Sequence, residues 1–373
     1  MANPNRKMAT IRRVASVDPI EGANRIERVT IDGWQVVTAK GAFAPGEFCI
    51  YMEPDTFLDI NDPRYAFLAE RGVKEMEVNG KMVTGHVLKV AKLRGTYSSG
   101  IAFKVDELLP QIPEERWAYL CDNGHDVSRV CGVREFVPVT SSGTMSFLGR
   151  YDTFVAPRTD CERCQNVKQH VFDLLKRTDH YANVKVDGTS ATICLDPRDN
   201  VLKVYSHNNR LSVDEGIGRA MLECATEQGL VEWCESHVGM TLQFEFAGEK
   251  IGGNRLGLKG RRCFVFSAYD MGAREYLDPY ELLHGTKVER SLTPLLDLDL
   301  SQFERPTDLL DYADSLVGNV TKGRHDEGIV IHVMGRGDIP DGEWVEARQV
   351  LYDALGSTMQ MKAVSPLYLS KAK

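Results

Sequence analysis

The sequence lacks several features that would assign it to a specialised class of protein. It has no apolar run near the roughly 20 residues that cross a bilayer, and Met-Ala-Asn-Pro-Asn-Arg-Lys at its start lacks the apolar core of a signal peptide. Low-complexity tracts and internal repeats are also absent from the sequence. We therefore expect a soluble, intracellular protein that makes no contact with a membrane.

An excess of positive charge is also missing, because 45 Lys and Arg stand against 53 Asp and Glu and give a net charge of −8. A surface for a polyanion such as nucleic acid must therefore be local. The two candidate clusters are Lys89, Lys92 and Arg94, and the denser run Arg255, Lys259, Arg261 and Arg262. Neither cluster indicates a binding site by itself, since most groups of charges form a solvated face.

Nine cysteines, an odd number in a chain of 373 residues, argue against a disulfide framework. Cys161-Glu-Arg-Cys164 has the spacing of metal ligands, and Cys121, His125 and Cys131 lie upstream. A structural zinc site needs two such pairs, and the sequence contains one. We therefore favour separate thiols over a zinc site.

The chain is long enough for two domains, each with a core of its own. Short strand patterns separated by turn residues predict a small barrel or sandwich over residues 1–112. Residues 113–150 have the composition of an irregular connector. Residues 151–373 predict an α+β domain, with strands near 190–195, 201–205, 241–246, 263–269 and 328–333, and helices near 161–177, 217–228 and 307–317.

Lys185-Val-Asp-Gly188 is the most informative motif. An apolar residue precedes the lysine and small hydroxyl residues follow the glycine, which suits a lysine held at a strand end as a nucleophile. If the strand continues, Asp187 projects from the same face as Lys185. The motif alone is weak, since roughly one chain in ten of this length carries K-x-D-G by chance.

Five residues downstream of Lys185 could belong to the same site. Glu245 lies in the middle of a strand pattern, Phe264 and Phe266 share a strand face, Glu327 begins an apolar strand, and Lys362 lies near the end. Each has an ordinary structural explanation when taken alone. Together they are typical of a site that holds a metal through carboxylates and water, phosphates through lysines, and a base by stacking.

The order of these motifs resembles that of the covalent nucleotidyltransferases, which include ATP-dependent ligases and mRNA capping enzymes. Residues 154–166 and 248–258 resemble segments of RNA ligases, and residues 19–27, 33–37 and 93–100 are similar to the OB domain of RNA ligases of the Deinococcus–Naegleria type. The resemblance implies an α+β fold: an N-terminal OB-fold β-barrel, then an ATP-grasp-like nucleotidyltransferase domain of antiparallel sheets with flanking helices.

The resemblance also implies an activity. Lys185 would take AMP from ATP with Mg²⁺ or Mn²⁺, and the AMP would pass to an RNA 5′-phosphate before a 3′-hydroxyl closes the strand. The partners would be RNA ends, including those of a nicked duplex, and we favour a monomer. A free lysine has a pKa near 10.4, and burial and nearby cations, including Lys362 and a divalent metal, can lower it.

The resemblance assigns roles residue by residue. Lys185 and Lys362 would be catalytic, and Asp187, Glu245 and Glu327 would serve the metal. Phe266 would stack on adenine, with Phe264 as the alternative. The other residues expected near the nucleotide are Val184, Glu245, Glu327, Arg163, Gln165, Asn166, His207 and Arg210.

Two positions depart from the family pattern. His207 stands where the family usually has arginine, so we expect Arg210 or a protonated His207 to supply the charge. Gln360 stands where a second lysine is common. The distance from Glu327 to Lys362 also looks long, and residues 335–344 resemble an inserted loop.

Two rival functions stay open. A DNA ligase or a GTP-using capping enzyme would share the chemistry, but these usually place the OB domain after the catalytic domain. A non-catalytic RNA-binding protein would explain the resemblance of residues 19–27 to tRNA-binding OB modules, and His207 and Gln360 would then reflect lost activity.

Overall fold

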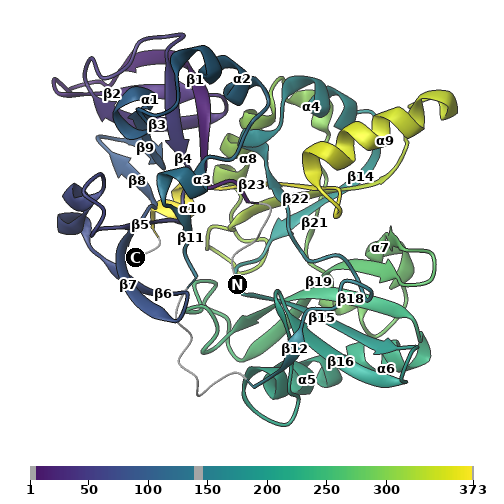
Figure 1. The fold of residues 1–373 in the computed structure, drawn as a ribbon. Coiled ribbons are helices and arrows are strands. Elements are labelled where there is room, and N and C mark those ends of the chain that lie inside the picture. The colour runs from purple at the N-terminus through teal and green to yellow at the C-terminus, as the bar shows by residue number, and fades with distance from the viewer. Residues whose placement is uncertain (1–5, 138–145, 372–373) are drawn as a thin grey trace. The chain divides into compact units, whose positions relative to one another are not determined.

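The structure is a computed structural model of the chain, and it describes residues 6–137 and 146–371 (Figure 1). The chain divides into two compact units. The first comprises Met1–Val139 with Leu369–Lys373, and the second comprises Thr140–Tyr368. In the described residues, no helix is both long and apolar enough to cross a membrane.

A curled five-stranded sheet forms the core of the first unit. Its order is β10 (Ile101–Lys104), β4 (Phe48–Met52), β1 (Ala9–Pro19), β2 (Ile26–Ile31) and β3 (Trp34–Ala39). An irregularity in β1 between Val14 and Ser16 lets its first half pair with β4 and its second half with β2. The hairpin of β8 (Val90–Leu93) and β9 (Thr96–Ser99) lies beside β3, where Ser98 Oγ accepts a hydrogen bond of 3.0 Å from the Val37 amide. The predicted barrel is confirmed as an OB fold by the comparison given below.

The rest of the first unit is a smaller sheet with short helices. The sheet order is β11 (Arg134–Glu135), β5 (Thr56–Asp59), β7 (Lys81–Val87) and β6 (Lys74–Val78). The helices are α1 (Val105–Leu108), α2 (Trp117–Asp122) and α3 (Ser128–Cys131). Part of the expected connector 113–150 is thus helical, and its residues 138–145 lie outside the described ranges. The boundaries 1–112, 113–150 and 151–373 remain a prediction.

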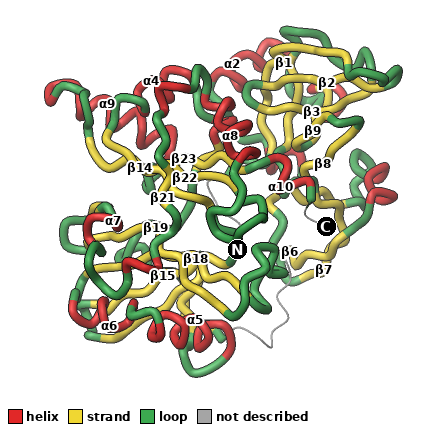
Figure 2. Tube along the Cα trace, turned by 180° about the vertical axis from the view of Figure 1, so that it is seen from behind, coloured by secondary structure: helices red, strands yellow, loops and turns green. Residues whose placement is uncertain are grey.

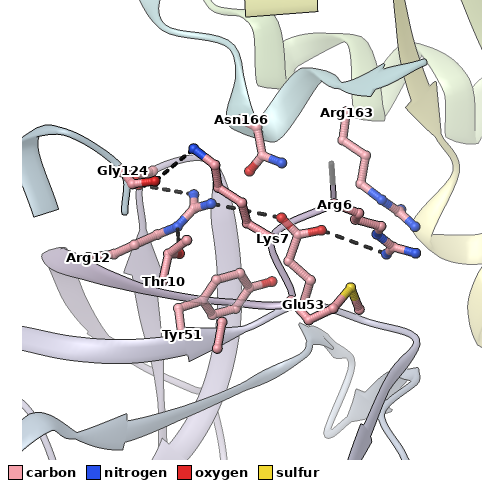
Figure 3. Close-up of polar contacts among 12 residues, drawn as sticks. Arg6, Lys7, Thr10, Arg12, Tyr51, Glu53, Gly124, Arg163 and Asn166 are labelled. Atoms are coloured by element: carbon pink, nitrogen blue, oxygen red, sulfur yellow. Dashed lines mark hydrogen bonds and ion pairs between the residues drawn. The ribbon is translucent and has the colours of Figure 1, made fainter. Parts of the chain in front are cut away.

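A buried carboxylate fixes the start of β1 (Figure 3). Glu53 is only 4% exposed, and its two oxygens lie 3.7 Å from Arg6 Nη2 and 3.8 Å from Arg12 Nη2. The Arg12 Nε also donates to Thr10 Oγ1 at 2.8 Å. Because a buried charge needs partners, these contacts give Glu53 a structural function.

A seven-stranded antiparallel sheet forms one half of the second unit. Its order is β12 (Phe147–Arg150), β17 (Asn209–Leu211), β16 (Val201–Ser206), β15 (Thr189–Asp196), β18 (Met240–Gly248), β19 (Arg261–Asp270) and β20 (Glu275–Leu277). Helices α5 (Gly216–Glu227) and α6 (Leu230–Ser236) cover one face, where Met221 and Trp233 join the core that includes Leu242 and Phe244 (Figure 1). These two helices do not cover the opposite face of the sheet.

A five-stranded sheet forms the other half of this unit (Figure 2). Its order is β13 (Glu162–Arg163), β23 (Gln360–Val364), β22 (Gly328–Gly335), β14 (Asp179–Lys185) and β21 (Leu295–Leu296). Only β13 and β23 pair in parallel among these described strands. The helices packed on it are α4 (Gln169–Leu175), α8 (Leu309–Ser315) and α9 (Asp341–Leu355).

The remaining elements are short. They are α7 (Pro279–Leu282), α10 (Pro366–Ser370) and 3-10 helices at Ala66–Arg71, Glu114–Arg116, Cys164–Asn166, Glu289–Ser291, Leu300–Gln302 and Pro306–Asp308. The expected inserted loop 335–344 is wrong in its second part, because α9 begins at Asp341. The α+β class with antiparallel sheets and flanking helices is confirmed.

Candidate active site

Lys185 is the last residue of β14, where that strand pairs with the first residue of β22. Its Nζ lies 2.8 Å from Glu327 Oε2, within hydrogen-bonding distance. The Lys185 side chain is 25% exposed and that of Glu327 is 12% exposed, so the pair is partly shielded from water but open to a ligand.

The ion pair keeps Lys185 protonated. Burial alone lowers the pKa of Lys185, but the negative charges of Glu327 and Glu245 outweigh burial and raise the pKa above its ordinary value. The protein's own charges therefore raise this pKa, and the expected lowering depends on the charge that a divalent metal would add. An attack by Lys185 requires that its proton be removed when the substrate binds.

Two glycines allow the backbones around Lys185 to approach closely. A Cβ atom at Gly188 would lie 2.5 Å from the carbonyl oxygen of Phe246 on β18. A Cβ atom at Gly328 would lie 2.1 Å from the carbonyl oxygen of Ala363 on β23. The glycines of the K-x-D-G and Glu327-Gly328 motifs are therefore required by packing.

Three carboxylates gather around the lysine. Burial raises the pKa of Glu245 to about 8; Lys185 opposes this rise, and the charges of Glu327 and Asp187 add to it. Burial also raises the pKa of Glu327, again with Asp187 adding to the rise. Asp187 lies beyond the end of β14, so the argument from strand alternation was wrong, although Asp187 still reaches the same cluster.

The two phenylalanines of β19 have different surroundings. Phe264 is 2% exposed and packs in a cluster with Val186, Ala247 and Leu256. Phe266 is partly exposed on the same strand, and its carbonyl oxygen accepts a hydrogen bond from Tyr181. Phe266 is therefore the ring that a base can reach.

Lys362 lies on β23, where it pairs with Val330 of β22 and with Arg163 of β13. Burial raises the pKa of Glu327, and the positive charge of Lys362 opposes that rise. Lys362 also adds to the effect of His207 and Arg158, which lower the pKa of Asp160 against burial, so Lys362 lies beside the cluster. Two other residues were expected near the nucleotide. Gln165 is buried, and the side-chain amide of Asn166 donates to Glu162 Oε1 at 2.9 Å.

His207 lies in a polar group next to the short strand β13. Its Nε2 is 3.3 Å from Asp160 Oδ1 and its Nδ1 is 3.2 Å from Thr159 Oγ1. Arg158 Nη1 donates to Asn208 at 3.5 Å, so a guanidinium does lie beside the position where the family has arginine. Arg210 instead lies near the buried Tyr205, whose pKa burial raises and the Arg210 charge lowers.

Two further predicted positions are buried. Val184 is 1% exposed and its amide donates to the Pro294 carbonyl, so only its backbone borders the site. Gln360 is 2% exposed, accepts a hydrogen bond from Cys161 Sγ at 3.0 Å and donates to Ser267. Gln360 is therefore a buried residue that adds no charge to the site.

The sequence reasoning missed Arg158, Asp160 and Tyr368. Arg158 and Asp160 stand two residues apart just before the partly buried strand β13, and this charged pair was a usable signal. Tyr368 donates to Asp187 Oδ2 at 2.7 Å from 181 residues away, and nothing local to either residue indicates that contact.

The donor set suits a hard divalent cation. Carboxylate oxygens are the ligands that Mg²⁺ and Mn²⁺ prefer, and Asp187, Glu245 and Glu327 lie close enough together for their charges to act on one another. In residues 6–137 and 146–371 no three His, Cys, Asp or Glu side chains form a direct metal cage. A divalent cation at these carboxylates would need water or phosphate oxygens among its ligands.

Comparisons with known proteins support this description. A family model described as an OB-fold domain matches residues 8–105. No curated protein matches the chain. The Naegleria gruberi RNA ligase with pyrophosphate has a TM-score of 0.76 and 28% identity, over 98% of this chain and 99% of that chain.

Two mutant structures of the same Naegleria gruberi RNA ligase match equally well. A lysine-to-alanine mutant with ATP and Mn and a glutamate-to-alanine mutant with AMP and Mn both have a TM-score of 0.76, 28% identity and coverage of 98% and 99%. The resemblance to RNA ligases of the Deinococcus–Naegleria type, first apparent in the sequence motifs, is therefore confirmed over almost the whole chain.

Proposed function

We propose that this protein is an ATP-dependent RNA ligase that joins 3′-hydroxyl and 5′-phosphate ends through AMP bound to Lys185. The observation that carries the proposal is the contact of 2.8 Å between Lys185 Nζ and Glu327, at the junction of two sheets in a fold similar to that of an RNA ligase. The carboxylate cluster and the accessible ring of Phe266 support it.

ATP binds with its base on Phe266 and its phosphates toward Lys362. The ring of Phe266 offers a stacking surface, while Phe264 supports it from the core. Lys362 stabilises the negative charge that develops on the α-phosphate. Arg163, Asn166 and His207 line the approach of the phosphates or of the RNA ends.

In the first step Lys185 must lose a proton, and the Glu327 carboxylate lies within reach to accept it. The neutral Nζ then attacks the α-phosphorus of ATP. The nitrogen–phosphorus bond forms as the bond to the bridging oxygen breaks, and pyrophosphate leaves. In the second step AMP passes to an RNA 5′-phosphate, and in the third a 3′-hydroxyl displaces AMP and closes the phosphodiester.

Asp187, Glu245 and Glu327 would hold Mg²⁺ or Mn²⁺, partly through water. Such an ion, when bound, supplies positive charge to the phosphate oxygens of the transition state. The carboxylates themselves orient the lysine and the bound water. An intracellular location and a monomeric state remain predictions.

Incubation with α-labelled ATP and Mg²⁺ or Mn²⁺ tests the proposal. The label is expected on the wild-type protein and absent from Lys185→Ala, and labelling of Lys185→Ala would overturn the assignment of the nucleophile. A nicked duplex with RNA or DNA on its 3′-hydroxyl side then separates an RNA ligase from a DNA ligase, and GTP tests the capping reaction. A protein that binds RNA in a salt-dependent way but takes no AMP would be a binding module.

A further inference from the structure

The segment that follows β23 is hydrogen-bonded to the backbone of Glu327 and to the carboxylate of Asp187. The Ser365 amide donates to the carbonyl oxygen of Glu327 at 2.9 Å. The Ser365 hydroxyl and the Leu367 amide both donate to Asp314 at the end of α8, at 2.5 and 3.1 Å. These bonds hold residues 365–368 against the site and fix the start of α10.

This segment places Tyr368 next to Asp187. Its ring is 5% exposed, and its hydroxyl donates to Asp187 Oδ2 at 2.7 Å. Burial, followed by the bond to Asp187, raises the pKa of Tyr368, so the hydroxyl remains a donor at neutral pH. The hydrogen bond from Tyr368 and the ion pair with Arg255 both involve Oδ2 of Asp187.

Arg255 completes the arrangement from the loop after β18. Its guanidinium carbon lies 3.6 Å from the centre of the Tyr368 ring, its Nη2 donates to the Tyr368 carbonyl at 2.5 Å, and its Nη1 lies 3.9 Å from Asp187 Oδ2. The loop is itself closed, because the Asn254 amide group exchanges hydrogen bonds of 2.9 and 3.0 Å with the Leu258 backbone. These bonds hold the backbone from which the Arg255 side chain extends.

We propose that Tyr368 and Arg255 are positioning residues that clamp Oδ2 of Asp187 and aim Oδ1 at the metal and its water. The inference rests on the proposed function, since it assigns Asp187 to the metal. Partners behind a metal-binding group commonly change metal affinity by about 10–100-fold when they are removed. The clamp also makes the terminal segment a part of the site, although it lies outside the motifs that carry the chemistry.

Mn²⁺ binding is the direct test, and it needs no turnover. In a Lys185→Met background, which keeps ATP intact, free Mn²⁺ is titrated by electron paramagnetic resonance with ATP present. Tyr368→Phe is expected to raise the Kd for Mn²⁺ by about tenfold. The matched control Tyr352→Phe, on the exposed side of α9, should leave the Kd unchanged. A Kd for Tyr368→Phe within twofold of the parent value overturns the proposal.

A double-mutant cycle separates positioning from general support of the fold. Tyr368→Phe in an Asp187→Ala background should have no further effect on Mn²⁺ affinity, because the group that it positions is gone. An undiminished effect there would contradict the clamp. If Tyr368→Phe fails to fold, Arg255→Gln serves in its place, with the same expected loss. Failure of the wild-type protein to take AMP would refute the proposed function instead, which keeps the two outcomes distinct.

Discussion

Glu327 determines the protonation state of Lys185 in the ligand-free protein, because the two side chains are in direct contact at 2.8 Å. The negative charge of Glu327 stabilises the ammonium form of Lys185, whereas an attack by Lys185 requires the neutral amine. The nucleophile is therefore stored in an unreactive form, and reactivity depends on what substrate binding does to the carboxylates around it.

Replacing Glu327 by Gln is expected to lower the pKa of Lys185, since the largest favourable charge next to the ammonium is lost. Reductive methylation with ¹³C-formaldehyde followed by an NMR titration measures that pKa, and Lys185→Arg assigns the signal. The exposed Glu343→Gln on α9 is the control and should leave the titration unchanged. An unaltered pKa in Glu327→Gln would mean that the ion pair does not control Lys185.

The two phenylalanines should separate binding from stability. Phe266→Ala is expected to weaken ATP binding by about 5- to 150-fold, the equivalent of about 1–3 kcal/mol of lost stacking, with little change in Tm. Phe264→Ala should instead lower the free energy of unfolding by about 3–5 kcal/mol, because it empties a buried position. Calorimetric titration of ATP and denaturant unfolding distinguish them, and the reverse pattern would assign the stacking ring to Phe264.

At the scale of elements, β14 and β22 bring the lysine and its carboxylate together and bury a histidine behind them. His332 on β22 is 3% exposed and stacks on Tyr181 of β14 with ring centres 4.3 Å apart. Burial lowers the pKa of His332 to about 3, so the folded protein holds it neutral. The strand pair that positions Lys185 therefore becomes weaker in acid.

The sign of the pH effect follows from the unfolded chain, in which a histidine has a pKa near 6.5. Below that pH, His332 is protonated in the unfolded chain but stays neutral in the folded protein. Each further pH unit of acidification therefore lowers the free energy of unfolding by about 1.4 kcal/mol. His332→Phe should flatten this slope between pH 6.5 and 5, whereas the exposed His170→Gln should not. Denaturant unfolding at several pH values measures it, and an equal slope in His332→Phe would refute this account.

Helix α9 illustrates what an element-level prediction can miss. Its buried residues Ala347, Leu351 and Leu355 recur every four positions, which is the pattern of a helix that covers a sheet. The long interval between Glu327 and Lys362 led instead to the expectation of an inserted loop over 335–344. The long interval between Glu327 and Lys362 is a helix packed on the five-stranded sheet, and it does not interrupt the site.

At the scale of the whole molecule, short motifs predicted the order of the units and the proximity of Lys185 to Glu245 and Glu327. These three residues could be grouped because each stands in a strand or at its end beside a glycine or an apolar run, and their roles in a reaction remain predictions. The clamp of Tyr368 and Arg255 on Asp187 could not, because it joins three distant segments through tertiary contacts. The raised pKa of Lys185 was also beyond sequence reasoning, since its sign depends on which charges lie nearest.

The net charge of −8 bears on the RNA step. Because RNA contacts must rely on local basic groups, joining should be more sensitive to salt than uptake of AMP. Three contacts to single-stranded phosphates would weaken binding roughly 20-fold between about 50 and 200 mM salt. Sealing by protein that already carries AMP, followed over this range, measures the effect, and equal salt dependence of both steps would contradict it.

The central claim is that Lys185 carries AMP between ATP and RNA. The intact mass of the purified protein tests it most directly, measured after ATP and Mg²⁺ or Mn²⁺ and again after pyrophosphate. We expect the mass to rise by one adenylyl group, to return to the unmodified value with pyrophosphate, and not to change in Lys185→Ala. An unchanged mass of the wild-type protein with either metal, or an adduct that persists in Lys185→Ala, would contradict the account.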